Sequence, residues 1–309
     1  MRPMERKVTK KQHYVFRTYL KPWADHDSIY CLREGRVFQA NLTKVACERF
    51  FYRLQDLTPS ELRLVEGFFS KHPSEPLKAI QKRFLETYLF PTRLRRQLGR
   101  NVDRKFLSAL DKVIAQGQED YHQKIEDDLL VFLRRMLAGD IDFYSDSAQA
   151  ASFLHGICVQ YTRTKRIIEA SIDVIGSEFN GCDVRRIMGA LSPLMAMAIG
   201  HGLFIDREKF KLVLIDNDSD TPFITADQPV VNLQAGYTRK PPEKLELFYP
   251  LSPKKAMLLL ETSSKRGEFP LGALSVNSYN MMMAKNSYEQ IFSNSEEYLN
   301  SIKGAIRCS

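Results

Sequence analysis

The spacing of apolar residues divides the chain into a helical middle part and a strand-rich second part. Between about residues 58 and 205, apolar residues recur every three or four positions, which is the period of a helix that packs on one face. From about 206 to 292 the pattern changes to short apolar runs between turns rich in Asp, Asn, Ser, Gly and Pro. The connections leave no room for crossover helices, so we expect a mainly antiparallel sheet. The expected strands are 210–215, 222–225, 230–233, 245–249 and 256–260.

Capping residues predict where the helices begin and end. Thr58, followed by Pro59 and Glu61, is typical of a helix start with a capping box. Pro91 is expected to end the next helical repeat, and Gly117 offers a point at which the following apolar stripe can divide into two helices. The other expected helix starts are Asp103, Asp146 or Ser147, Asp183, a residue near Ser275, and one after Ser295.

Residues 12–23 predict a helix in which His13 and Arg17 share one face, one turn apart. Apolar residues hold the neighbouring faces, and Pro22 ends the pattern. Two hydrogen-bonding side chains fixed by so much apolar bulk form either a structural polar cluster or part of a site, and the sequence leaves both open. After this helix, residues 28–32 and 36–40 predict a hairpin that turns at Glu34 and Gly35.

Together these elements predict an α+β protein. It would have an N-terminal helix and hairpin, a helical subregion at about 58–205, and a C-terminal, mainly antiparallel sheet with flanking helices at about 206–292. No long linker separates these parts, so we expect residues 1–309 to form a single domain.

Composition points to a cytoplasmic protein that does not interact with a membrane. The five cysteines are scattered and none has CxxC spacing, which argues against a thiolate zinc site and fits a reducing compartment. No apolar run follows the first residues, so a secretory signal is not expected. Residues 187–205 carry no charge, but Pro193, His201 and several glycines dilute their hydrophobicity, which favours a buried helix over a membrane span.

Positive charge is concentrated in two segments of the chain. The net charge is +8, and the clusters lie within residues 2–17 and from Arg93 to Lys105. Arginine binds phosphate through paired hydrogen bonds, so nucleic acid is a candidate partner. The alternative is a solvated helix end, which is the commoner outcome. The candidate nucleic-acid-binding residues are Arg17, Arg93, Arg95, Arg96 and Arg100.

Three polar positions have the spacing of a site. Glu119, His122 and Glu126 share one side of a predicted helix, and Glu-x-x-His is a metal-ligand spacing in carboxylate-bridged bundles. That site needs a second such helix, which the sequence lacks, so a solvated charged face is favoured.

Gln160 and Arg163, three residues apart on an apolar helix, can point into one cleft. The buried arginine would need an acidic partner, which Glu126 or Asp227 can supply, so a structural salt bridge is equally open.

Asp227 lies at the end of an apolar strand, two residues before Pro229. A carboxylate held there is either a ligand or base, or an Asp that forms a turn with the backbone that follows. The phosphate-binding, dinucleotide-binding, GxSxG and HExxH motifs are all absent from the sequence. Nucleotide-driven motors, dinucleotide oxidoreductases, α/β-hydrolases and zincins therefore lose support, and no nucleotide cofactor is expected.

A series of short motifs in a fixed order carries a family resemblance. The motifs are His13-Tyr14-Val15 with Tyr19-Leu20, Glu48 with Phe51-Tyr52, Ile125-Glu126, Gln160-x-x-Arg163-Thr164, Phe223-Ile224-Thr225-x-Asp227-x-Pro229-Val230 and Pro250-Leu251-Ser252-Pro253. On these motifs the chain resembles an uncharacterised bacterial family, the domain of unknown function 4238, over about residues 12–292. Phe16 and Lys165 stand where proline is common in that family.

The resemblance implies an architecture and a set of residues, but no reaction. It makes six polar residues candidates for one convergent catalytic cluster, because polar residues from separate elements that meet in a core need a reason beyond packing. These candidates are His13, Glu48, Glu126, Gln160, Arg163 and Asp227.

Two hypotheses follow for this cluster. The first is a metal-dependent phosphodiester hydrolase, a nuclease of the toxin or phage-defence kind, although the defence context follows only from the bacterial family. Glu48, Glu126 and Asp227 would hold one or two Mg²⁺ or Mn²⁺ ions that generate hydroxide, His13 would be an acid, base or ligand, and Arg163 would stabilise the transition state. The second is a non-catalytic component of a bacterial assembly, which binds protein or nucleic acid and buries the cluster as a structural network.

Overall fold

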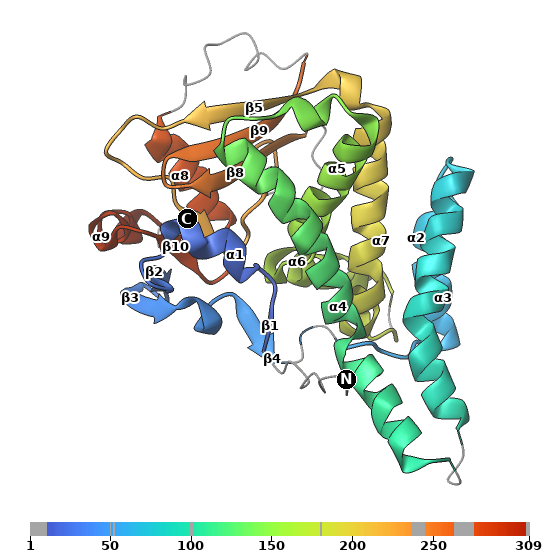
Figure 1. Cartoon of the computed structure of the whole chain (residues 1–309). Coiled ribbons are helices and arrows are strands. Elements are labelled where there is room, and N and C mark those ends of the chain that lie inside the picture. Colours follow the sequence, from blue (N-terminus) through green and yellow to red (C-terminus); the bar gives the residue numbers. More distant parts are fainter. Residues whose placement is uncertain are drawn as a thin grey trace, which may run out of the picture.

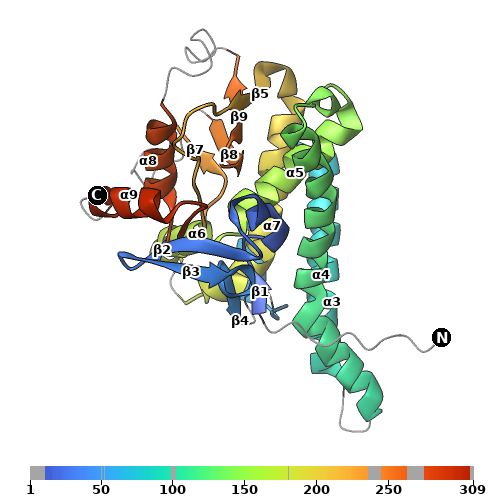
Figure 2. The same ribbon diagram turned by 60° about the vertical axis from the view of Figure 1, so that its left-hand side comes forward.

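The computed structural model describes residues 11–49, 51, 53–98, 102–179, 181–235, 245–262 and 275–306. Figures 1 and 2 show long helices grouped on one side, small sheets on the other, and a short ribbon of two strands between them. Helices and antiparallel sheets together confirm the predicted α+β class.

Long helices form the middle of the described chain and begin at the predicted caps. The backbone N–H of Thr58 donates to Glu61 Oε2 at 2.8 Å and the Thr58 hydroxyl accepts from the N–H of Glu61, which completes the capping box. Asp103, Asp146 and Asp183 also accept backbone N–H groups at the starts of their helices. The helices are α2 (Pro59–Ser70), α3 (Glu75–Gln97), α4 (Arg104–Leu137), α5 (Ser147–Thr162), α6 (Lys165–Glu178) and α7 (Val184–Ile205).

One predicted helix boundary is wrong, and one possible helix break does not occur. Helix α3 continues through Pro91, whose ring is buried, so packing outweighs the lost backbone hydrogen bond. Helix α4 is continuous over 34 residues and contains Gly117. A Cβ at Gly117 would lie 3.2 Å from Leu54 Cδ1, so this glycine admits close packing against the segment before α2 rather than breaking the helix.

The N-terminal helix is shorter than predicted. Lys11–His13 form strand β1, and the helix is confined to α1 (Arg17–Leu20) and the following η1 (Lys21–Trp23). Strand β1 pairs antiparallel with β4 (Cys47–Arg49), and His13 lies opposite Cys47. This pairing between distant segments outweighs the local helical pattern. His13 and Arg17 therefore do not share a helix face.

Two antiparallel sheets lie beside the helices. The predicted hairpin turns at Glu34 and Gly35, whose φ angles of 51° and 73° fit a type I′ turn, and it pairs with strands from the C-terminal part in the order β3-β2-β10-β6. The other sheet has the order β5-β9-β8-β7 and contains four of the five predicted C-terminal strands. The predicted strand 222–225 is instead reduced to the short β6, which belongs to the first sheet. The strands are β2 (Ser28–Arg33), β3 (Arg36–Asn41), β5 (Phe210–Asp216), β6 (Thr225–Ala226), β7 (Val231–Asn232), β8 (Glu246–Ser252), β9 (Lys255–Glu261) and β10 (Ile291–Ser293). The remaining elements are η2 (Leu42–Lys44), η3 (Asp142–Tyr144), η4 (Arg207–Lys209), α8 (Val276–Asn286) and α9 (Glu296–Ile306).

A hydrophobic core cluster joins the helical and β-rich parts. It includes Trp23 from η1, Leu133 from α4, Phe153 from α5 and Leu247 from β8, all buried. Trp23 Nε1 also donates to the carbonyl oxygen of Phe223 at 2.7 Å. These contacts cross the boundary at residue 206, while the single-domain organisation stays a prediction.

Helix α7 contains the uncharged segment noted in the sequence. It is long and apolar enough to cross a membrane by length and composition, and 56% of its most apolar window is buried inside the fold. A Cβ added at Gly200 would lie 3.4 Å from the Cα of His155, so α7 and α5 cross closely there. Its burial against α5 supports the predicted core helix.

Candidate functional site

A buried ion pair joins two of the predicted residues, Arg163 and Glu126. Arg163 Nη1 lies 2.7 Å from Glu126 Oε1, and the two side chains are 2% and 15% exposed. Arg163 Nη2 also donates to the carbonyl oxygen of His13. One guanidinium therefore connects the end of α5, the middle of α4 and strand β1. Neither charge can be removed without leaving the other unpaired in the interior.

An open cleft of about 530 Å³ lies beside this ion pair, between α4 and the segment from β1 to α1. Glu119 and Glu126 line it from α4, and His13 and Arg17 line it from the N-terminal segment. Lys11, an exposed residue, adds a second positive charge at the rim. The volume is within the range of ligand and substrate sites.

His13 contributes an uncharged imidazole to the cleft. Burial lowers the pKa of His13 to about 4, and a hydrogen bond with the backbone of Leu42 opposes this shift. Nε2 is buried and has no hydrogen-bond partner among the described residues. A hydrogen bond that raises a histidine pKa is one that the ring donates, so Nδ1 carries the proton and Nε2 keeps its lone pair. His13 therefore stays uncharged at neutral pH, with a free lone pair on Nε2.

Glu119 contributes a carboxyl group that holds its proton near neutral pH. Burial raises the pKa of Glu119 to about 7, while the charge of Arg163 lowers it. Its buried Oε2 has no hydrogen-bond partner within the described part of the chain. Burial also raises the pKa of Glu126, but its direct ion pair with Arg163 opposes that shift. Glu119 and Glu126 lie two turns apart on one helix but in different environments. In many active sites such a difference keeps one carboxyl group protonated, as the acid, and the other ionised.

Glu119→Gln is expected to make stability less sensitive to rising pH. The folded state keeps Glu119 protonated up to a pKa of about 7, whereas its ordinary value is 4.5. Folding therefore becomes less favourable as pH rises through this window, and glutamine, which resembles the protonated acid, removes that loss. After allowance for partial exposure, the variant should be more stable than the wild type by about 1–2 kcal/mol at pH 8 and equal to it at pH 4.5. Urea unfolding at both pH values measures this.

A matched substitution controls for the loss of one carboxylate. Glu86 on α3 is exposed, so Glu86→Gln should leave the difference from the wild type unchanged between the two pH values. The same constant difference in Glu119→Gln would show that Glu119 ionises normally in the folded protein.

Gln160 and Asp227 bond to the backbone and do not line this cleft. Gln160 Nε2 donates to the carbonyl oxygen of Tyr14 at 3.1 Å. Asp227 is 1% exposed, and its two oxygens accept backbone N–H groups from residues 288, 289 and 290 at 2.8, 2.7 and 2.9 Å. Burial raises the pKa of Asp227 to about 6, and these three donors oppose the shift. Asp227 is rigidly placed, as predicted, but it holds a segment far along the chain rather than the turn that follows it.

The three carboxylates predicted to share a metal ion lie in three different environments. Glu126 pairs with Arg163, Asp227 accepts three backbone N–H groups, and the half-exposed Glu48 lies 3.6 Å from Lys165. Within the described residues, no group of three or more His, Cys, Asp or Glu could hold a metal ion. These donors do not fit one shared ion, and metal dependence stays a prediction.

The predicted nucleic-acid-binding arginines also separate. Arg17 is exposed at the rim of the cleft. Near the end of α3, Arg95 Nε lies 2.8 Å from Asp111 Oδ1 and Arg96 Nη1 lies 2.8 Å from Asp56 Oδ2, so both charges are paired. Arg93 is half-buried on the same helix, and Arg100 lies outside the described residues. Of this group, Arg17 is the residue that the structure places at the cleft.

Glu119 is the cleft residue that sequence reasoning assigned to a solvated face. The structure places Glu119 and Glu126 half-buried and His122 buried, because β1 and the following segment cover this face of α4. The available signal was the spacing: positions 119, 122 and 126 continue the buried stripe of Leu129 and Leu133 at intervals of three and four.

Comparison with known proteins gives a family and no activity. Residues 11–297 match the family model described as "Protein of unknown function (DUF4238)". No curated protein and no solved structure matches the chain.

Proposed function

Because the chain belongs to the domain of unknown function 4238 family, whose description carries no activity, we propose a function from the cleft itself: hydrolysis of phosphodiester bonds in nucleic acid. One observation carries this proposal. A carboxylic acid with a pKa of about 7, an uncharged histidine with an unpartnered nitrogen, and a buried arginine converge beside one open cleft. Unpartnered polar atoms that are buried cost free energy, so their presence together favours a bound water or ligand at this place.

The acid and the base have separate roles in this reaction. Water attacks phosphorus while His13 Nε2 takes its proton, directly or through a second water. The bond from phosphorus to the leaving oxygen breaks, and Glu119 donates its proton to that oxygen. Solvent then returns the proton from His13 to Glu119. Each step uses the protonation state that the cleft imposes at neutral pH.

Basic side chains lie on the side of the cleft opposite the carboxyl groups of α4. Arg17 and Lys11 at the rim would neutralise phosphate oxygens. Arg163 holds Glu126 and β1 in place, and its charge favours the anionic transition state. No step is assigned to a metal ion, because the carboxylates predicted to bind one do not meet. A toxin or phage-defence role would suit such a hydrolase and is part of the proposal.

Incubation of the protein with labelled single-stranded and double-stranded DNA and RNA tests this function. We expect cleavage at neutral pH that falls as pH rises above about 7, since Glu119 then loses its proton. Glu119→Gln should lower the rate about 10²- to 10⁴-fold, the usual contribution of a general acid. Parallel reactions with Mg²⁺, with Mn²⁺ and with a chelator show whether a metal is needed.

Glu86→Gln is the matched control and should keep full activity. Nucleic acid that stays intact in every reaction would overturn the proposal. Cleavage that Glu119→Gln leaves unchanged would place the activity outside this cleft.

A binding protein without catalysis is the second candidate. Gln160 and Asp227, two members of the predicted cluster, form hydrogen bonds with backbone groups, as residues of a structural network do. In that case nucleic acid would bind and remain uncleaved, and Glu119→Gln would leave its affinity unchanged.

A further inference from the structure

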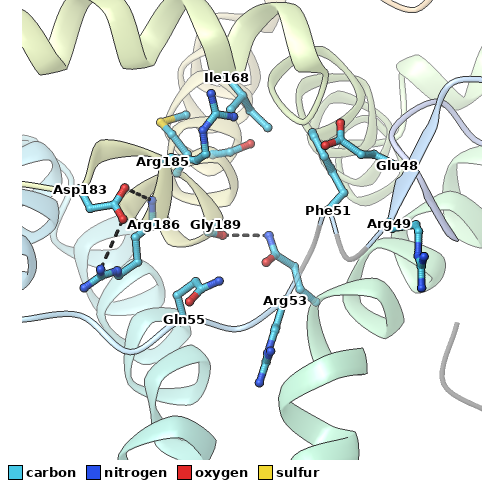
Figure 3. A pocket seen from close by; sticks show the side chains of 13 residues that line it. Glu48, Arg49, Phe51, Arg53, Gln55, Ile168, Asp183, Arg185, Arg186 and Gly189 are labelled. Carbon is cyan, nitrogen blue, oxygen red and sulfur yellow. Dashed lines mark hydrogen bonds and ion pairs between the residues drawn. The ribbon is translucent and has the colours of Figure 1, made fainter. Parts of the chain in front are cut away.

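A second cavity, of about 390 Å³, is lined by residues of β4, whereas the cleft described above is lined by residues of β1. Glu48 and Arg49 of β4, Phe51 and Arg53 line it on one side, and the first turns of α7 line it on the other. Figure 3 shows arginine side chains on different sides of this cavity: Arg185 and Arg186 from α7, and Arg49 and Arg53 from the segment opposite. We call it the arginine pocket.

Two of its four arginines are held by carboxylates. Both terminal nitrogens of Arg185 bond to Glu169, at 2.7 Å each. Arg186 Nη2 lies 3.3 Å from Asp183 Oδ2, and its Nη1 lies 3.6 Å from the buried Glu61. These ion pairs fix the two side chains at the pocket wall and largely balance their charge.

The other two arginines provide the uncompensated charge. Arg49 and Arg53 are exposed, and neither forms an ion pair with any residue that the structure describes. The nearby carboxylate of Glu48 is directed to another residue, since its Oε2 lies 3.6 Å from Lys165 Nζ. Guanidinium groups without a protein partner are the groups most ready to bind phosphate through paired hydrogen bonds.

An aromatic ring lies between these two arginines in the sequence. Arg49, Phe51 and Arg53 are spaced by two residues in the sequence, and all three line the pocket. Phe51 is half-buried, and its ring packs against Tyr14 with 5.4 Å between centroids. Alternating cationic and aromatic residues are the pattern of surfaces that bind single strands, where arginines contact phosphates and the ring stacks on a base.

From these contacts we infer that the arginine pocket binds the backbone of single-stranded nucleic acid, with phosphates on Arg49 and Arg53 and a base beside Phe51. Binding there does not require catalysis. Its link to the cleft rests on the proposed function. Paired strands lie about 4.8 Å apart, so residues of β1 and β4 that line the two sites are close neighbours. Lys11 and His13 of β1 line the cleft, whereas Glu48 and Arg49 of β4 line the pocket. A single strand of nucleic acid that is bound in the pocket can therefore extend across the ribbon into the cleft.

Fluorescence anisotropy with a labelled oligothymidylate tests this inference. All variants carry Glu119→Gln, so the oligonucleotide stays intact whether or not the cleft cleaves it. Arg49→Gln with Arg53→Gln should weaken binding at least about tenfold at moderate salt. The slope of log affinity against log salt should decrease by about 1.4, which corresponds to two lost phosphate contacts on a single strand.

The matched control removes two exposed arginines elsewhere, with Arg36→Gln on β3 and Arg134→Gln at the end of α4. It has the same net charge as the test variant and should keep nearly full affinity. Equal losses in both variants would show attraction by net charge alone and overturn the inference. So would unchanged binding in the test variant, or binding of a phosphoserine peptide in place of the oligonucleotide.

The cleavage assay separates this inference from the proposed function. Binding that depends on Arg49 and Arg53, without cleavage by the wild type, supports the pocket and overturns the hydrolase. Cleavage by the wild type, together with binding that does not depend on either arginine, supports the hydrolase and overturns the inference about the pocket.

Discussion

Arg163→Met should lower the free energy of unfolding by about 3–5 kcal/mol, because it leaves the carboxylate of Glu126, whose side chain is only 15% exposed, without its ion-pair partner. The carbonyl oxygen of His13 loses its donor in the same variant, so β1 is also released from the end of α5. Methionine keeps most of the side-chain volume, which limits the contribution of an empty cavity. Urea unfolding at neutral pH measures the loss.

A second substitution identifies its cause. Adding Glu126→Leu to Arg163→Met removes the stranded charge and should recover much of the lost stability, since apolar replacement of a whole buried ion pair is often close to neutral. Arg95→Met provides the matched control. Arg95 also pairs with a carboxylate at 2.8 Å, but its side chain is 40% exposed, so the change should stay below about 1 kcal/mol. Similar effects at Arg163 and Arg95 would contradict the assignment of a buried charge pair.

Asp227→Ala should also destabilise the protein strongly, by about 3–5 kcal/mol. Its carboxylate accepts the backbone N–H groups of residues 288, 289 and 290, and each buried donor left unsatisfied costs about 1–3 kcal/mol. Asp227 also lies beside β6, which pairs with β10 directly after this segment. Thermal unfolding followed by circular dichroism measures the effect as a lowered Tm.

Asp218→Ala is the comparison for this variant. Asp218 is exposed in the loop after β5, so its removal should change Tm very little. Equal melting temperatures for the two variants would mean that Asp227 does not hold the 288–290 segment.

Local signals in the sequence predicted most helix starts and strands. Thr58, Asp146 and Asp183 were recognised because a capping side chain bonds to N–H groups within three residues of itself. The hairpin turn at Glu34 and Gly35 is equally local. Such interactions join residues that are close in the sequence, so they can be predicted without knowledge of the fold.

Features set by distant contacts were harder to predict. The pattern around His13 is helical, but pairing with residues 47–49 makes it a strand. The charges around Glu119 favour a solvated face, and its spacing with Leu129 alone does not show that β1 covers this part of α4. The sequence leaves two possible partners for Arg163, Glu126 and Asp227. The structure pairs it with Glu126, and this choice depends on distances in the folded chain that a sequence does not contain.

The segment held by Asp227 also links the order of synthesis to the shape of the cleft. Gln290 donates to the Tyr14 hydroxyl at 3.1 Å and accepts the backbone N–H of Ala46 at 3.1 Å. Residue 290 therefore braces the segment beside the ribbon that forms one wall of the cleft, from more than 240 positions away in the chain. This wall can reach its final form only after residues 288–290 have been synthesised and have docked onto the N-terminal segment.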